Sequence, residues 1–551
     1  MTASSRPVAP RRSSLRLLLA SLGVGLFLLP PGCQCAEAPP PPAPRGRLVM
    51  SVVIDQLGSD TLERLFPVLD EDGLIRTLAR QGVYHHTVRY EHGATMTAPG
   101  HATLYTGRSP REHGVIANIL LDRETREDST PLSDPEFPMI GASPYTASPR
   151  GMRGDSVSLA LLDSTDGRAR VLAVSLKDRG AIPAAARAGA THAFWYESRA
   201  SGFTTSTFYA ERYPAWFEAF LRAHPLERRL GLWEADPALV QRLLALGLRD
   251  DVEGEQDWYG LGTTFPHDVS GSSRPATVFR VTPESTAYML DLARAGVQAL
   301  QLGEDEVPDL LALSISATDY AGHIFGAESW EYAHTLVDSD RQLGALYRSL
   351  SRRSDVSVLL TSDHGGPRLP ERAGTGPSLQ EDELVALLEA HLDSQLGPAD
   401  YIAGFKDVYI YLTPTALLQR ERVNPLALAF LEQQRGIHRV FDVAQLAAQP
   451  APTDPLTRAV WESVSAGLGG DLYVVPQEQF LFGAGYVHGG VWHGSPWDYD
   501  RNVPVLFMGP GVVPADGQAT MSTLQVAPTL CRLLGARELE GASMRALPGA
   551  P

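Results

Sequence analysis

Five short apolar runs, each followed closely by polar residues, are the feature that most limits how this chain can fold. They are Leu48–Ile54, Val171–Leu176, Leu310–Ser316, Val356–Leu360 and Val503–Met508. Their length suits strands, and because they are apolar throughout rather than alternating, we expect both faces of the sheet to be covered. Longer helical patterns lie between them, at Ser285–Leu302 and Trp330–Ser351. The sequence therefore predicts an α/β fold with a central, mostly parallel sheet flanked by helices.

Two segments of the chain fit this alternation poorly. Residues 185–280 and 365–480 contain aromatic-rich and Pro/Gly-rich pieces. We interpret both as insertions that form a cap over the sheet edge. Residues 46–551 are then one large domain with two insertions, rather than several independent domains.

The N-terminus has the pattern of an export signal. The first part of residues 1–32 contains arginines and lacks acidic residues. The apolar run that follows, Leu17–Leu29, is too short to span a bilayer comfortably as a helix. Gly32 and Cys33 resemble the cleavage site of a bacterial lipoprotein, in which Cys33 would carry the lipid and attach the protein to the membrane. An uncleaved signal anchor is the alternative. Residues 33–45 are predicted to be a Pro-rich tether, and the protein is expected to be periplasmic or lipid-anchored at the bacterial cell envelope.

Composition excludes several classes of protein. Apolar residues make up 44% of the 551-residue chain and charged residues 20%, a balance typical of globular proteins. The formal net charge of −17 disfavours nucleic-acid binding. Three cysteines are too few for a disulfide scaffold. One of them, Cys531, lies in an apolar helical pattern and is predicted to be a buried thiol.

Acidic and histidine residues follow three of the predicted strands. Asp55 comes directly after the first strand, Asp319 and His323 follow the third, and Asp363 and His364 follow the fourth. In an open α/β sheet the carboxyl ends of the strands face one crevice, where ligands bind. We therefore expect these five side chains to converge, although they are far apart in sequence.

Carboxylates together with imidazoles form a ligand set that suits zinc or a similar divalent ion. Five such residues are too many for one catalytic zinc, which indicates two metals and a missing sixth ligand. His493 is the best candidate for that ligand, and His488 is the rival. For any single aspartate, simple capping of a helix after a strand is an equally good explanation.

Two further features suit an anionic ligand. Thr97 lies near a predicted helix start that contains Pro99, where free backbone N–H groups favour anions. Lys177 and Arg179 follow the second strand and suit the oxygens of a phosphate group. The alternatives are a plain threonine N-cap and a solvated turn.

Together these residues resemble the alkaline phosphatase superfamily, in particular the PafA-like, phosphate-insensitive alkaline phosphatases with a threonine nucleophile. The resemblance extends over roughly residues 46–545. The motifs that carry it are Val53–Gln56, Thr97–His101, His113–Asn118, Ser175–Ile182, Ser316–His323, Thr361–Gly365, His493–Pro496 and Val526–Leu530.

The resemblance implies two Zn²⁺ ions as cofactors and a covalent phosphothreonine intermediate. The residues that it assigns to the first zinc are Asp319, His323 and His493. Those that it assigns to the second are Asp55, Asp363, His364 and the Thr97 hydroxyl. The residues that it assigns to catalysis are Thr97 as nucleophile, and Asn118, Lys177 and Arg179 as contacts to the phosphate.

The expected activity is hydrolysis of small-molecule phosphate monoesters, with weaker activity on diesters. Lys177 and Arg179 could take the extra charged oxygen that distinguishes a monoester from a diester. Thr97 cannot give the formylglycine that sulfatases need, which disfavours that branch. The alternatives are a phosphodiesterase or phosphonate hydrolase on the same scaffold, and a surface-tethered binding protein that has lost catalysis.

Overall fold

The computed structural model describes residues 47–186, 191–200, 202–375, 379–480, 482–483 and 490–551. The predicted signal peptide, Cys33 and the tether therefore lie outside the described residues, as does His488. Among the helices that are described, none has both the length and the apolar character needed to cross a bilayer.

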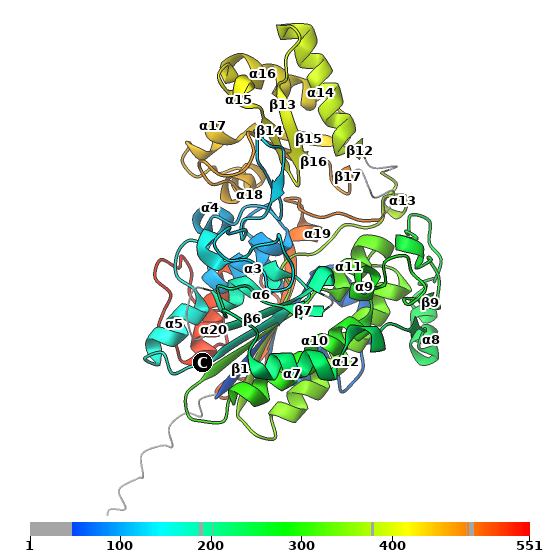
Figure 1. Cartoon of the computed structure of the whole chain (residues 1–551), viewed down its shortest axis with the longest axis vertical. Coiled ribbons are helices and arrows are strands. Elements are labelled where there is room, and N and C mark those ends of the chain that lie inside the picture. Colours follow the sequence, from blue (N-terminus) through cyan, green and yellow to red (C-terminus); the bar gives the residue numbers. More distant parts are fainter. Residues whose placement is uncertain (1–46, 187–190, 201, 376–378, 481, 484–489) are drawn as a thin grey trace, which may run out of the picture. The chain divides into compact units, whose positions relative to one another are not determined.

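The largest sheet of the described residues has ten strands, and it lies among helices in the lower part of Figure 1. Its five parallel strands are, in spatial order, β11 (Val356–Thr361), β1 (Leu48–Ile54), β10 (Asp309–Ile315), β5 (Val171–Ser175) and β6 (Thr191–Glu197). Every residue of β1, β10 and β11 is buried. The predicted α/β class and the mostly parallel central sheet are confirmed, because continuous apolar strands require cover on both faces.

The remaining strands extend the sheet on both sides, largely in antiparallel pairs. β18 (Asn502–Met508) pairs antiparallel with β11 and with β2 (Val83–Arg89). Beyond them, β2 pairs with β19 (Ala515–Gly517) and β20 (Met521–Ser522). At the opposite side, β7 (Gly202–Thr204) pairs antiparallel with β6.

Successive side chains of β1 enter different cores. Met50 and Val52 belong to one hydrophobic cluster, and Val49 and Val53 belong to another. The first cluster includes residues of α2 (Leu74–Gln81), α7 (Ala215–Ala223), α10 (Pro283–Leu300) and α12 (Trp330–Leu350). The second includes residues of α3 (Thr97–Thr106), α5 (Val157–Ser164), α6 (Asp178–Ala185) and α20 (Val526–Leu534), where Cys531 is buried as predicted.

Part of the segment 185–280 belongs to the central sheet, so the interpretation of that whole segment as a cap is wrong at its start. The strand β6 reads THAFWYE, and its aromatic residues do not resemble the aliphatic runs of the other strands. Its position beside β5 is set by packing in the core, which overrides the local pattern.

Residues 402–476 build a second, four-stranded antiparallel sheet in the order β13 (Ile402–Lys406), β14 (Tyr409–Leu412), β16 (Leu472–Pro476) and β15 (Ile437–Asp442). The helices α14 (Glu381–Leu396) and α16 (Arg420–Leu431) pack on it through a hydrophobic cluster of their own. The turn between β13 and β14 carries Asp407 back to the site described below.

Shorter elements connect these units: α1 (Ser59–Leu65), α4 (Pro110–His113), α8 (Pro237–Ala245), α9 (Pro275–Val278), α11 (Ala317–Phe325), α13 (Pro370–Ala373), α15 (Pro414–Leu417), α17 (Val443–Ala447), α18 (Pro455–Ser463), α19 (Asp498–Arg501), β3 (Leu120–Leu121), β4 (Asp128–Ser129), β8 (Leu232–Trp233), β9 (His267–Asp268), β12 (Leu379–Gln380) and β17 (Phe482–Gly483).

Candidate active site

The carboxyl ends of three parallel strands bring the predicted metal ligands together. Asp55 follows β1 directly, the helix α11 carries Asp319 and His323 after β10, and Asp363 and His364 follow β11. Among the described residues there are two groups of three candidate ligands. Within each group, the ligand atoms of the three residues lie within 4.8 Å of one another. Five residues that are far apart in sequence therefore converge, as the crevice geometry of a parallel sheet requires.

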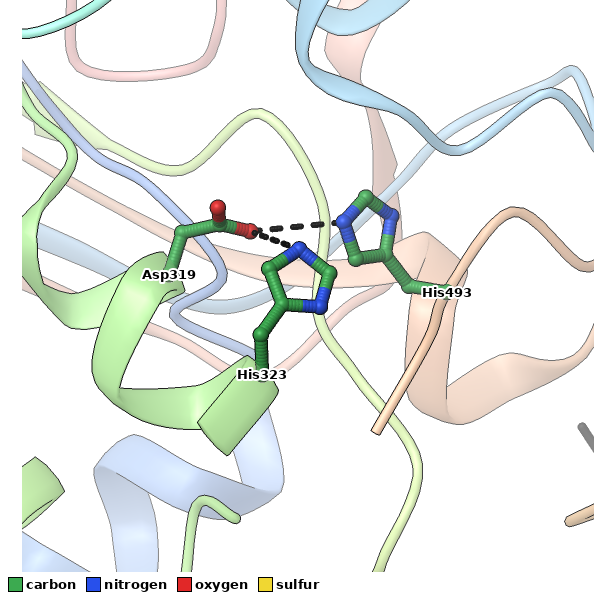
Figure 2. Close-up of side chains that lie close together, drawn as sticks. All are labelled: Asp319, His323 and His493. Atoms are coloured by element: carbon green, nitrogen blue, oxygen red, sulfur yellow. Dashed lines mark ion pairs between the residues drawn. The ribbon is translucent and has the colours of Figure 1, made fainter. Parts of the chain in front are cut away.

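The first group consists of Asp319, His323 and His493, shown in Figure 2. The Nε2 atoms of both histidines lie 3.3 Å from Asp319 Oδ1. The Nδ1 atom of His323 is hydrogen-bonded to the carbonyl of Val491 at 2.5 Å, and Nδ1 of His493 to the carbonyl of Thr95 at 2.8 Å. A carbonyl can only accept, so each Nδ1 carries the proton and each Nε2 keeps a free lone pair directed at the group.

The second group consists of Asp55, Asp363 and His364, all fully buried. His364 Nε2 lies 3.4 Å from Asp55 Oδ1 and 3.6 Å from Asp363 Oδ2. Its Nδ1 is hydrogen-bonded to the carbonyl of Gly365 at 2.8 Å. In all three histidines of the two groups, Nδ1 is hydrogen-bonded to a backbone carbonyl. This hydrogen bond leaves the Nε2 lone pair free to bind a metal ion.

The charges of the two groups call for a cation. Burial raises the pKa of Asp55, and the neighbouring carboxylates of Asp319 and Asp363 raise it further. Among the described residues, the buried atoms Asp55 Oδ1, Asp319 Oδ1 and His364 Nε2 have no hydrogen-bond partner. Buried carboxylates are stable only when they are paired or coordinate a metal. The two groups therefore fit divalent metal ions, and their oxygen and nitrogen ligands are those that zinc accepts.

Thr97 is the first residue of α3 and is fully buried. The N-cap position is occupied by Met96, so Thr97 is not the capping residue. Its Oγ1 instead accepts a hydrogen bond from Lys177 Nζ at 3.1 Å. Gly100 allows this placement, because a Cβ atom there would lie 2.3 Å from the carbonyl oxygen of Asp363. The helix start is therefore packed directly against the end of β11.

Lys177 contacts both metal-ligand groups. It follows β5, is only 4% exposed, and its Nζ lies 2.8 Å from Asp55 Oδ2 and 2.5 Å from Asp319 Oδ2. Burial opposes its charge, yet Asp319 and Asp55 raise its pKa above the usual value. A solvated turn is therefore the wrong description of this residue. Arg179, two residues later, is 28% exposed at its side chain.

Several of the site side chains border one cavity of about 650 Å³. Its lining includes Thr97, Asn118, Lys177, Arg179 and Asp319. The Asn118 side chain points to the start of α3, where its Oδ1 accepts a hydrogen bond from the backbone N–H of Ala98 at 2.9 Å. The amide N–H₂ of Asn118 is thereby directed away from Ala98 and is available to an anion.

The structure gives a positioning role to two residues: Asp407, which the sequence analysis missed, and His101, which it placed only within the motif Thr97–His101. Asp407 Oδ2 accepts hydrogen bonds from the backbone N–H groups of Asn118 and Ile119, at 2.7 and 2.9 Å. No local pattern could have found it, because it reaches the site from the second sheet. His101 Nδ1 lies 3.2 Å from Asp363 Oδ2, and the four-residue spacing from Thr97 on one helix is a signal that could have revealed it.

Comparisons with known proteins agree with this geometry. Residues 49–382 match the type I phosphodiesterase/nucleotide pyrophosphatase family. Alkaline phosphatase PafA of Elizabethkingia meningoseptica is 27% identical over 515 residues, which cover 89% of this chain and 92% of the relative. Alkaline phosphatase PhoK of a Sphingomonas species is 28% identical over 510 residues, which cover 89% of this chain and 88% of the relative.

Solved structures give the same result. The crystal structure of wild-type alkaline phosphatase PafA superposes with a TM-score of 0.83 at 26% identity, covering 92% of this chain and 99% of that one. A second PafA structure is a variant substituted at a threonine, an asparagine, a lysine and an arginine; it superposes with a TM-score of 0.81 at 25% identity, covering 92% of this chain and 98% of that one.

Proposed function

Because the chain belongs to the type I phosphodiesterase/nucleotide pyrophosphatase family, we propose that it hydrolyses phosphate esters, and more narrowly that it is a two-zinc phosphomonoesterase with Thr97 as nucleophile. The observation that carries the proposal is the position of the Thr97 hydroxyl. It lies 3.1 Å from Lys177 Nζ, and that ammonium contacts both metal-ligand groups. The names of the relatives, alkaline phosphatases PafA and PhoK, support it.

The two metal ions would be held by separate sets of residues. Asp319, His323 and His493 would hold one, and Asp55, Asp363 and His364 the other, with the Thr97 hydroxyl as a further ligand of the second. When bound, the zinc ions supply positive charge that favours the deprotonated threonine and the departing oxygen.

The residues of the chain then act in two displacements. Thr97 Oγ1 forms a bond to phosphorus while the bond from phosphorus to the leaving oxygen breaks, which leaves a phosphothreonine. Water next attacks that phosphorus, the bond to Thr97 breaks, and inorganic phosphate is released. The Asn118 amide donates to an equatorial oxygen, and Lys177 and Arg179 neutralise charge in a loose transition state.

Two cations at the phosphate suit a monoester dianion better than a diester monoanion. The PafA variant substituted at threonine, asparagine, lysine and arginine supports this set, since these are the residue types of Thr97, Asn118, Lys177 and Arg179 in the same order.

The double variant Lys177→Ala/Arg179→Ala is expected to lower kcat/KM for phenyl phosphate by about a hundredfold or more. The kcat/KM for methyl phenyl phosphate should fall much less. An equal fall in kcat/KM for both substrates would contradict the role of these two cations.

The comparison of these two substrates on the zinc-loaded wild-type protein tests the proposal itself. A higher kcat/KM for phenyl phosphate supports a monoesterase. A preference for methyl phenyl phosphate would favour the alternative of a phosphodiesterase or phosphonate hydrolase. A metal-loaded protein that turns over neither would be a binding protein on this scaffold.

Asp407 offers a test of how the Asn118 loop is held. Asp407→Ala removes the acceptor of two backbone N–H groups, and we expect kcat/KM for phenyl phosphate to fall about tenfold, with a loss of about 1–3 kcal/mol in unfolding free energy. Asp407→Asn should recover most of the activity, because an amide oxygen still accepts. Asp128→Ala, which removes only an exposed partner of Lys406, is the control. Wild-type activity in Asp407→Ala would refute the positioning role.

We also propose that residues 1–32 direct export and that Cys33 carries a lipid. The Cys33→Ala variant should then move from the membrane fraction to the soluble fraction of cells. Unchanged membrane association would favour the uncleaved signal anchor.

A further inference from the structure

One wall of the active-site cavity carries two arginines that have no carboxylate partner among the described residues. Arg280 donates to the carbonyl of Thr277 at 3.1 Å and to the Tyr320 hydroxyl at 2.9 Å. Arg274 lies over the ring of Tyr259, with its guanidinium carbon 4.7 Å from the ring centroid. Both arginines line the same cavity as Thr97. Cations with no carboxylate partner among the described residues are notable in a chain with a formal net charge of −17.

Aromatic rings hold Arg280 in place. Its guanidinium carbon lies 4.5 Å from the centroid of the Tyr320 ring and 5.8 Å from that of Trp258, and the two rings are stacked on each other. Lys177 Nζ lies 5.2 Å from the centroid of the same Tyr320 ring. The phenol ring of Tyr320 therefore contacts both the lysine of the phosphate site and Arg280, which places the two cations around one aromatic ring.

The carboxylates of the cavity do not neutralise Arg280. Glu197 is 3.7 Å from Arg199, Asp407 accepts from the Asn118 loop, and Asp319 belongs to a metal-ligand group. Arg280 is held by two rings, one hydroxyl and one carbonyl, and none of the described carboxylates pairs with it. Such a guanidinium is prepared to bind an anion, since hydrogen bonds between ionised groups are stronger than neutral ones.

We propose that this wall, formed by Arg280, Arg274, Trp258, Tyr259 and Tyr320, is a leaving-group subsite for a second anionic group. The preferred substrates are phosphate monoesters whose leaving group itself carries a carboxylate or a second phosphate. The first phosphate occupies the site of Thr97, and the second anion binds Arg280. This inference rests on the proposed phosphomonoesterase activity.

Matched pairs of substrates test the subsite. The carboxylate arm compares 4-carboxyphenyl phosphate with 4-carbamoylphenyl phosphate, which has the same shape without the charge. The phosphate arm compares propane-1,3-diol bisphosphate with the monophosphate, after correction for its two equivalent ends. We expect kcat/KM to favour the anionic member by about tenfold, mainly through KM. The carbamoyl group withdraws electrons more strongly than the carboxylate, so intrinsic reactivity alone would favour the neutral member.

In the arm that uses the subsite, Arg280→Gln should reduce the preference for the anionic member to near one or, in the carboxylate arm, below one. Arg222→Gln is the matched control, because Arg222 is an exposed arginine of α7 that pairs with Glu218; it should leave the preference unchanged. The wild-type preference should also fall with increasing salt, a measurement that needs no variant.

The outcomes separate the two proposals. If the zinc-loaded wild type hydrolyses none of the four substrates, the phosphomonoesterase proposal fails. If it hydrolyses both members equally well in both arms, or if Arg280→Gln lowers both members by the same factor, only the subsite is refuted. A preference in one arm alone identifies whether carboxylate or phosphate is the second anion.

Discussion

The variant Thr97→Ala is expected to lower kcat/KM for phenyl phosphate by at least about a thousandfold, because it removes the oxygen that attacks phosphorus. Its fold should persist, since the substitution deletes one buried hydrogen bond, worth about 1 kcal/mol. Thr97→Ser keeps the hydroxyl and should retain far more activity. Acid quenching after mixing with ³²P-labelled substrate should leave the label on wild-type protein and none on Thr97→Ala.

The control for this experiment lies on the same helix. Thr106 is also buried, and its hydroxyl donates to the carbonyl of Ala102 at 2.7 Å, within α3 rather than into the site. Thr106→Ala should therefore show wild-type kinetics with a similar change in thermal stability. Label that persists on Thr97→Ala, or turnover within tenfold of wild type, would show that another group attacks phosphorus.

The sequence predicts the centre of this fold well because one physical rule covers it. Strands such as β1 and β10 are buried on both faces, so they are apolar throughout and easy to recognise. In a parallel sheet their carboxyl ends meet, so polar residues just beyond them must lie close together. Asp55, Asp319 and Asp363 could be brought together on this rule alone.

The parts that the sequence did not predict depend on contacts between distant segments. The strand β6 is aromatic, and its place in the sheet follows from packing beside β5. Asp407 reaches Asn118 from a turn of the second sheet, and no spacing or composition indicates that hydrogen bond. Arg280 becomes informative only in three dimensions, where it lies against two rings and no carboxylate of the described segments pairs with it. Residues that position the active site or select the substrate are thus harder to find from sequence than residues that bind the metal ions.

Removal of metal is expected to have the other large effect. Dialysis of the zinc-loaded protein against a chelator should lower kcat/KM for phenyl phosphate about a thousandfold or more, and restored zinc should return it. The free energy of unfolding should fall by several kcal/mol, since ligand binding to the folded state alone is stabilising. Asp55, Asp319 and Asp363 would otherwise remain buried together, with Lys177 as the cation that contacts the first two.

A single-ligand variant separates the two ion sites. His323→Ala removes an imidazole from the first group only, so metal analysis should find one of the two zinc equivalents lost while the second stays bound. His86→Ala is the matched control, because His86 pairs with Asp516 at a partly exposed position of β2 and belongs to neither group. Full activity in the metal-free protein would refute the zinc mechanism. Loss of both ions from His323→Ala would instead show that the groups bind cooperatively, which their shared contact through Lys177 makes physically reasonable.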